Sequence, residues 1–156
     1  MKVFDKRVVV TGGASGIGKA LCEAFNNAGA KSIVVVDLNE EDGKKTASDV
    51  NGHFIKTDVS SESEIKSLIT EVNNYMGGID IFCSNAGIIG VPGFMEASVE
   101  DWNNMWSVNV MSHIHAAKHV LPQMLERGEG YLVNTASAAG LLTQIGAAGY
   151  AVTKNA

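Results

Sequence analysis

Short runs rich in valine and isoleucine alternate along this chain with longer segments whose apolar residues recur every three or four positions. The alternation constrains the fold strongly, because it is typical of βαβ units, in which parallel strands form a sheet and helices cover both faces. Five runs are short and mostly apolar, as strands buried on both sides should be: residues 7–10, 32–36, 53–56, 79–84 and 131–135. The sequence therefore predicts an α/β fold with a doubly wound parallel sheet.

Local signals mark the helix ends between these runs. The segment from Ser61 to Glu64 predicts a capping box, and Asn39 precedes an acidic first turn. Gly29 and the pair at 77–78 follow helical patterns, where a left-handed glycine can end a helix. The longest helical pattern runs from about residue 98 to residue 125, with Pro122 as a candidate kink near its end.

The composition fits one globular domain. The chain has 156 residues, of which 46% are hydrophobic, and no repeat, low-complexity tract or linker divides residues 1–156. A net charge of −5 gives no basic surface for nucleic acid or for an acidic membrane. Cys22 and Cys83 have no disulfide or metal-binding spacing, and no apolar run near the N-terminus is long enough for a signal peptide or a membrane span. We therefore expect buried free thiols and a cytoplasmic protein.

A glycine-rich turn, TGGASGIG at residues 11–18, follows the first predicted strand and opens a helix. Free backbone N–H groups and the helix dipole at such a turn favour a pyrophosphate. The glycine spacing is Gly-x3-Gly-x-Gly rather than the common GxGxxG. The residues predicted to hold a dinucleotide here are Gly12, Ser15, Gly16, Ile17 and Gly18.

Asp37 ends the second predicted strand nineteen residues after Gly18. An acidic side chain at that position can accept hydrogen bonds from the hydroxyls of an adenosine ribose. It would repel a 2′-phosphate, and neither Leu38 nor the glycine loop offers an arginine or lysine to receive one. The predicted cofactor is therefore NAD rather than NADP. The alternative is a turn rich in glycine beside a solvated strand-end aspartate.

Further motifs follow in order along the chain: SNAG at residues 84–87, Asn109, Ser137, and Tyr150 with Lys154 four residues later. Together with the glycine loop and Asp37, they resemble the short-chain dehydrogenase/reductase family over nearly the whole chain. The resemblance implies a Rossmann-type α/β/α sandwich and a nicotinamide cofactor. It also implies a homodimer or homotetramer, because the long helix contributes to subunit contacts in related enzymes.

The same resemblance assigns the remaining cofactor contacts. Leu38, next to Asp37, and Tyr150 would also contact the cofactor. Asp58 and Val59, after the third strand, would contact the adenine ring. Asn85, Ala86 and Gly87 would wall the cofactor. The serine at position 84, where the family often has a second asparagine, is expected to affect packing more than chemistry.

The residue types of the last motif suit hydride chemistry on an alcohol or carbonyl compound. Oxidation of an alcohol needs a hydride acceptor and a base for the hydroxyl proton. Tyr150 is the candidate base, and Lys154, one helical turn later on the same face, would stabilise its phenolate. Ser137, at the end of the fifth run, would hydrogen-bond the substrate oxygen. The family resemblance adds that Lys154 holds the nicotinamide ribose and that Asn109 supports a proton-relaying water.

The sequence gives weaker signals for other functions. Ser137 lies in no G-x-S-x-G elbow, which argues against a nucleophilic serine. His115 and His119 have a spacing that can bind a metal, but no third ligand is indicated and hydride transfer needs none, so we expect no metal. Trp102 and Trp106 are expected in the core or in a subunit contact. A non-catalytic nucleotide-binding or regulatory protein with the same fold stays open as the alternative.

The chain ends two residues after Lys154. Family members continue with further strands, so we expect the C-terminal strands of the sheet to be missing and the fifth strand to form an edge. The apolar loop of residues 138–149, with Leu141, Leu142 and Ile145, is expected to form a pocket wall. Substrate identity is open beyond an alcohol or carbonyl compound.

Overall fold

The computed structural model describes residues 2–90, 93–142 and 145–156. Its strands are β1 (Arg7–Thr11), β2 (Ser32–Asp37), β3 (His53–Lys56), β4 (Ile81–Ser84) and β5 (Tyr131–Asn134). They form one five-stranded sheet in the order β3-β2-β1-β4-β5, with every pair parallel. The predicted doubly wound parallel sheet is confirmed.

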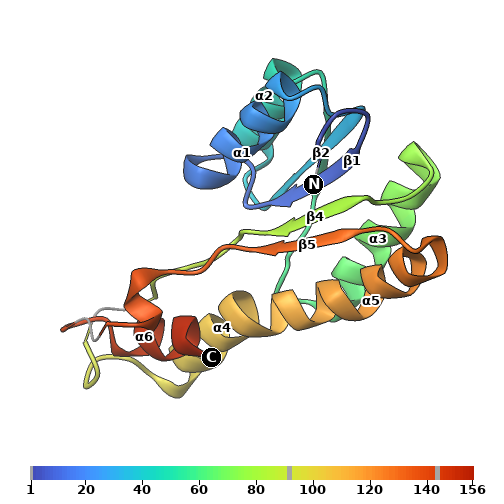
Figure 1. Ribbon diagram of the computed structural model, residues 1–156. Helices are drawn as coiled ribbons and strands as arrows, with labels where there is room; N and C mark the ends of the chain where they lie inside the picture. The colour runs from blue at the N-terminus through green and yellow to red at the C-terminus, as the bar shows by residue number, and fades with distance from the viewer. Residues whose placement is uncertain (1, 91–92, 143–144) are drawn as a thin grey trace.

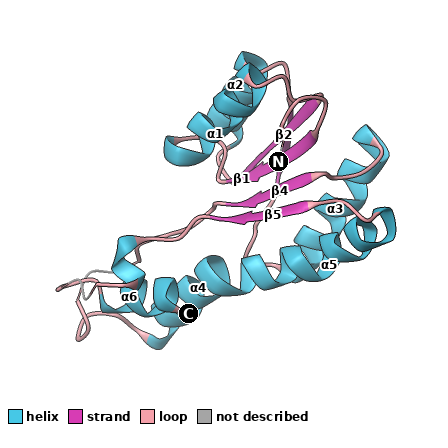
Figure 2. Ribbon diagram, in the orientation of Figure 1, coloured by secondary structure: helices cyan, strands magenta, loops and turns pink. Residues whose placement is uncertain are grey.

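Helices cover both faces of this sheet (Figures 1 and 2). They are α1 (Gly16–Asn27), α2 (Glu40–Asp49), α3 (Glu62–Met76), α4 (Val99–Trp106), α5 (Ser112–Arg127) and α6 (Ala148–Asn155). Figure 1 shows α1 and α2 on one side and α3, α4 and α5 on the other, with α6 beyond the end of β5. None of the described helices is long and apolar enough to span a membrane.

Alternate residues of the strands build a core on each face. Val8 and Val10 pack with Cys22 and Phe25 of α1 on one face. Val9, between them, points to the other face, where α3 and α5 contribute half of the buried apolar side chains. All three valines are fully buried, which explains why the first run reads as continuously apolar. The strands at the two edges of the described sheet, β3 and β5, are only partly buried.

Local signals were mostly correct at the helix ends. Asn39 caps α2 by accepting a hydrogen bond from the backbone N–H of Asp42 at 3.2 Å. Gly77 ends α3 with a φ of 75°, the left-handed conformation that the sequence predicts. The capping box at Ser61 is only half formed, however. Its hydroxyl caps α3, but the Glu64 carboxylate accepts from the backbone N–H of Asp58 at 2.7 Å instead of reaching back to Ser61.

Two other boundaries differ from the prediction. The fourth strand begins at Ile81 rather than at residue 79, since the backbone N–H of Ile79 donates to the side chain of Gln123 at 3.2 Å instead of joining the sheet. The long helix is interrupted by a π-helical turn over Ser107–Met111, and α5 continues through Pro122 to Arg127. π-Turns are frequent at functional sites, and this one contains Asn109.

Candidate active site

The carboxyl ends of β1 and β4 lie side by side at the point where strand order reverses, the usual ligand crevice of such sheets. The hydroxyl of Thr11 donates to the carbonyl of Cys83 at 3.2 Å and accepts from the backbone N–H of Asn85 at 3.0 Å. The Asn85 side chain donates to the carbonyl of Thr11 at 3.0 Å and accepts from the hydroxyl of Thr135 at 2.9 Å. These bonds join the ends of β1, β4 and β5 into one platform.

The glycine loop is shaped as a cradle against this platform. A Cβ on Gly18 would lie 1.9 Å from the carbonyl oxygen of Gly12, and a Cβ on Gly12 would lie 2.9 Å from the Cα of Ala86. Gly16 has a φ of 51° but open space around it. Ser15, the N-cap of α1, makes no side-chain capping bond, so its side chain does not cover the first N–H groups of the helix. The loop therefore fits a bound pyrophosphate.

Asp37 and its neighbours line a second part of the crevice. The two carboxylate oxygens of Asp37 accept hydrogen bonds from the backbone N–H groups of Ala14 and Asn39, each at 3.0 Å. A cavity of about 160 Å³ adjoins them. Its lining includes the predicted adenosine contacts Asp37, Leu38, Asp58 and Val59, together with Gly12, Ala86 and Gly87.

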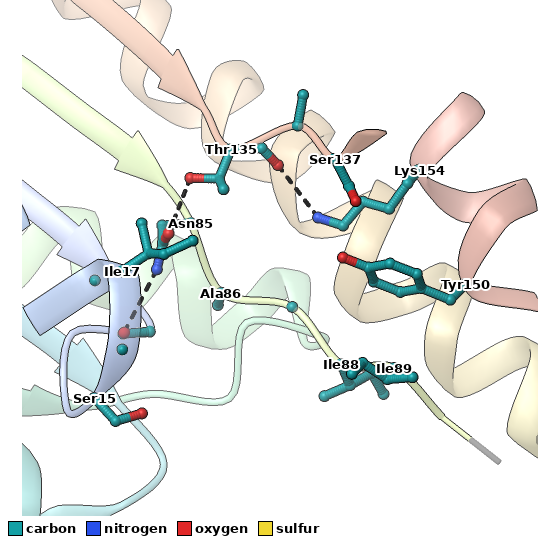
Figure 3. A pocket seen from close by; sticks show the side chains of 15 residues that line it. Ser15, Ile17, Asn85, Ala86, Ile88, Ile89, Thr135, Ser137, Tyr150 and Lys154 are labelled. Carbon is teal, nitrogen blue, oxygen red and sulfur yellow. Dashed lines mark hydrogen bonds between the residues drawn. The ribbon is translucent and has the colours of Figure 1, made fainter. Parts of the chain in front are cut away.

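Tyr150 and Lys154 project from the same face of α6, as the spacing predicts (Figure 3). The Lys154 ammonium lies 5.9 Å from the centroid of the Tyr150 ring and donates to the carbonyl of Thr135 at 3.2 Å. Ser137 begins a 3-10 turn, where its hydroxyl accepts from the backbone N–H of Ala139 at 3.2 Å. The hydroxyl can still donate one hydrogen bond.

These groups share one cavity with the glycine loop. It has a volume of about 370 Å³. Its lining contains eleven of the predicted residues: Gly12, Ser15, Gly16, Ile17, Gly18, Asn85, Ala86, Gly87, Ser137, Tyr150 and Lys154. The fold thus brings residues from the beginning and the end of the chain to one place, with the adenosine-side cavity next to it through Gly12, Ala86 and Gly87.

Asn109 lies behind this cavity rather than in its wall. Its Nδ2 donates to the carbonyl of Ile88 at 2.8 Å and to the hydroxyl of Thr153 at 3.0 Å, and its Oδ1 accepts from the backbone N–H of Ile88 at 2.9 Å. Both donor hydrogens are therefore used. One lone pair of Oδ1 remains, which is what the predicted water would need. A Cβ on Gly87 would lie 3.2 Å from this oxygen and 3.4 Å from the Lys154 nitrogen, so the two groups meet against Gly87.

Comparison with known proteins agrees with this geometry. The family model described as short chain dehydrogenase matches residues 6–156. The chain belongs to the short-chain dehydrogenase family. The resemblance that the motifs predict is thereby confirmed, and the family consists of oxidoreductases.

Individual relatives of this short-chain dehydrogenase cover the chain completely but extend beyond its length. The uncharacterized oxidoreductase YvrD of Bacillus subtilis is 34% identical over 100% of this chain and 60% of its own length. The 2,5-dichloro-2,5-cyclohexadiene-1,4-diol dehydrogenase LinX of Sphingobium indicum is 35% identical over 99% of this chain and 64% of its own length. A crystal structure of a short-chain dehydrogenase/reductase from Burkholderia phymatum in complex with NAD has a TM-score of 0.94 at 31% identity, covering 99% of this chain and 57% of that one. The chain thus spans about three fifths of the length of these relatives.

Sequence reasoning missed three threonines of this candidate site. Thr11 and Thr135 bind Asn85 from the ends of β1 and β5, the strands on either side of β4, and the buried Thr153 joins Asn109 to α6. Each is a hydroxyl residue at a strand end or between the Tyr and Lys of the motif. A polar residue at such a position was the available signal, but its partner is far away in the sequence.

The predicted apolar wall is in part elsewhere. Leu141 and Leu142 line a separate groove with the outer face of α6, and Ile145 is almost fully exposed. Ile88 and Ile89 line the cavity of Tyr150 and Lys154 instead. They follow β4 closely, so the sheet brings them to this cavity.

The histidines, cysteines and tryptophans lie outside the catalytic cavity. Glu62 of α3 approaches His119 at 3.1 Å and His115 at 3.6 Å, and the part of the chain that is described holds no group of three or more His, Cys, Asp or Glu side chains arranged for a metal. Cys22 and Cys83 are buried and free, and burial raises the pKa of each thiol to about 12. Trp102 packs edge-on against Phe94, whereas the side chain of Trp106 is 42% exposed.

Proposed function

We propose that this chain carries the cofactor-binding and catalytic residues of an NAD-dependent oxidoreductase acting on a secondary alcohol or the matching carbonyl compound. The observation that carries the proposal is the single cavity shared by the glycine loop and by Ser137, Tyr150 and Lys154. A cradle for a pyrophosphate and an acid–base pair beside it are the two parts that such a reaction needs. The name of the Sphingobium relative, a diol dehydrogenase, supports an alcohol as substrate.

In the direction of alcohol oxidation, Ser137 donates a hydrogen bond to the substrate oxygen and thereby orients it. Tyr150 removes the hydroxyl proton. The ammonium of Lys154, which donates to the carbonyl of Thr135, lies 5.9 Å from the centroid of the Tyr150 ring and would attract the negative charge that develops on the tyrosine oxygen. A nicotinamide cofactor held by the glycine loop and Lys154 would supply the acceptor for the hydride of the carbinol carbon. In the reverse direction Tyr150 returns the proton to the carbonyl oxygen.

Asn109 acts in this scheme from behind the lysine. Its two bonds to the backbone of Ile88 hold the segment that follows β4. The free lone pair of its Oδ1 would support a water through which Lys154 exchanges protons with solvent. Both tasks require the amide to be fixed, and its burial among three polar partners fixes it.

The choice of NAD over NADP rests on Asp37. Its carboxylate borders the adenosine-side cavity, whose described lining includes neither lysine nor arginine. A 2′-phosphate placed there would meet like charge without a partner, which at a few ångströms costs roughly 1–2 kcal/mol in a partly solvated site. Asp58 and Val59 would flank the adenine.

We also propose a homo-oligomer in a reducing, cytoplasmic compartment. Trp106, Ile114, Leu121 and Leu125 form an exposed apolar stripe along α4 and α5, which supports a subunit contact. The free, buried thiols support the compartment.

Replacement of Tyr150 by Phe tests the proposal. We expect kcat/KM for NADH formation from secondary alcohols to fall at least a hundredfold, because the proton acceptor is lost while the ring is kept. NADH binding, measured by fluorescence, should stay within about twofold. The matched control is Tyr75→Phe, which removes a phenol hydroxyl from the exposed surface of α3. Full activity in Tyr150→Phe would refute the role of the tyrosine, and NADH binding without any turnover by the unmodified protein would favour a non-catalytic nucleotide-binding protein.

A further inference from the structure

The catalytic cavity offers a substrate very little charge. Among its described lining residues, Lys154 alone carries a charge. The Lys154 ammonium donates one of its three N–H groups to the Thr135 carbonyl and lies 5.9 Å from the centroid of the Tyr150 ring, and the proposed function assigns it to the tyrosine and the cofactor ribose. An anionic group on a substrate would therefore find, among the described lining residues, no cation besides the one that this reaction needs.

The two segments beside the cavity are uncharged over their whole length. Residues 88–95 follow β4, and residues 138–149 connect the end of β5 to α6. None of these twenty residues is Asp, Glu, Lys, Arg or His, although charged residues make up 19% of the chain and about four would be expected. The first charged residue after residues 88–95 is Glu96, which is acidic and would repel an anion, and the first after residues 138–149 is Lys154 of the catalytic pair.

A backbone hydrogen bond joins these segments. The N–H of Gly93 donates to the carbonyl of Gly146 at 2.8 Å. Both glycines have positive φ, 90° and 81°, a conformation that residues with side chains rarely adopt. Gly93 and Gly146, one in each segment, are thus held side by side just before α6.

Large apolar side chains stand out from these joined segments. The exposed fractions are 66% for Ile89, 86% for Met95 and 99% for Ile145. Ile89 continues directly into the catalytic cavity, where it and Ile88 lie near the ring of Tyr150 (Figure 3). An exposed apolar surface that is continuous with a reaction site is typical of a ligand-binding wall.

Resting on the proposed function, we infer that the substrate is an uncharged alcohol or ketone with an apolar skeleton beside the reacting carbon, rather than a hydroxy acid or a phosphate ester. Each methylene that Ile88 and Ile89 cover favours binding, because apolar surface is removed from water. A carboxylate in the same place loses hydration without gaining a partner. This wall is therefore expected to distinguish substrates by their charge more strongly than by their shape.

The test compares two substrates that differ in charge and by one methyl group: methyl 3-hydroxybutyrate and 3-hydroxybutyrate, with NADH formation as the readout. We expect kcat/KM for the ester to exceed that for the acid at least tenfold. Ile89→Lys should shrink this ratio at least fivefold by supplying a cation at the wall. The control, Phe4→Lys, places the same charge on an exposed residue that precedes β1, and should leave the ratio unchanged.

A binding measurement separates failure of the inference from failure of the proposed function. Methyl acetoacetate and acetoacetate are titrated into the NADH-loaded protein, and the change in NADH fluorescence gives their affinities whether or not turnover occurs. Faster turnover of the anion than of the ester overturns the substrate class but leaves an oxidoreductase. Tighter binding of the anion also overturns the substrate class. Preference for the ester in binding, with no turnover of either compound, supports the class of ligand and refutes the catalytic proposal.

Discussion

Replacing Thr153 by Val should weaken both the fold and the reaction, because it removes one buried hydroxyl at nearly constant shape. Thr153 is 2% exposed. Its oxygen accepts from the Nδ2 of Asn109 and donates to the carbonyl of Tyr150, each at 3.0 Å. The hydroxyl is thus the link between the π-turn of the long helix and the helix that carries the tyrosine and lysine.

The expected loss of stability follows from what the substitution leaves unpaired. One N–H of the buried Asn109 loses its acceptor, which costs about 1–3 kcal/mol. The Tyr150 carbonyl keeps other possible partners within the helix, so its loss adds little. We expect the free energy of unfolding to fall by about 2 kcal/mol, small enough for a domain of ordinary stability to remain folded.

The expected loss of activity follows from position. With one bond missing, the Asn109 amide no longer fixes Ile88 and α6 relative to each other, and small misplacement of a catalytic group lowers rates steeply. We expect kcat to fall about tenfold, with NADH affinity within about twofold. Thr153→Ser, which keeps the hydroxyl, should restore most of the rate.

The assays are urea unfolding followed by circular dichroism and steady-state NADH formation. Thr70→Val is the matched control, since the hydroxyl of Thr70 also donates to a carbonyl within a helix, at 3.0 Å, but on an exposed surface. Its stability should change by less than about 0.5 kcal/mol. If Thr153→Val unfolds at the wild-type urea concentration and keeps the wild-type rate, the hydroxyl does not position the site. Equal losses in Thr153→Ser would point to packing instead of hydrogen bonding.

Three further predictions concern the glycine loop, the Arg7–Asp80 ion pair and the choice of cofactor. Gly18→Ala should destabilise the protein by about 3 kcal/mol and weaken NADH binding at least tenfold in a fluorescence titration, because its Cβ would lie 1.9 Å from a backbone carbonyl. The control Gly16→Ala has open space and only a strained φ, so it should lower the free energy of unfolding by about 1 kcal/mol. Equal effects of the two substitutions would contradict the steric argument. Arg7 lowers the pKa of Asp80 from 3.8 to about 2, so the pair should contribute roughly 2 kcal/mol to the free energy of unfolding above pH 4. This contribution is lost as the pH falls toward 2, so urea unfolding should show Asp80→Asn less stable than the wild type at pH 7, with the gap closing below pH 4; a gap independent of pH would exclude the ion pair as its cause. Asp37→Asn should shift the ratio of NADPH to NADH affinity toward NADPH about tenfold in calorimetry, and an unchanged ratio would remove Asp37 from cofactor selection.

The strands, the glycine loop and the Tyr–Lys pair were predictable because their signals are local. A run such as Val8 to Val10 is apolar wherever it folds, and the glycines at positions 12, 16 and 18 permit a tight turn and a close backbone approach that side chains would hinder. Tyr150 and Lys154 share a helix face by their spacing alone. A cap residue such as Asn39 accepts a hydrogen bond from a backbone N–H that lies within four positions of it in the sequence. For each of these features the physical cause and the sequence signal lie in the same short segment.

Other features depend on contacts between distant segments, and the sequence alone misplaced or missed them. The Glu64 carboxylate accepts a hydrogen bond from the backbone N–H of Asp58, which precedes α3, instead of completing the capping box with Ser61. Thr153 acquires a role only when α6 packs against the π-turn, and Leu141 lines an outer groove rather than the predicted wall. The sequence by itself determined the sheet, the cofactor loop and the reacting groups, since backbone conformation and helical period are local properties. Only the tertiary structure decided which side chains hold those groups and which line the pocket, because hydrogen bonds and burial across the chain depend on its three-dimensional path.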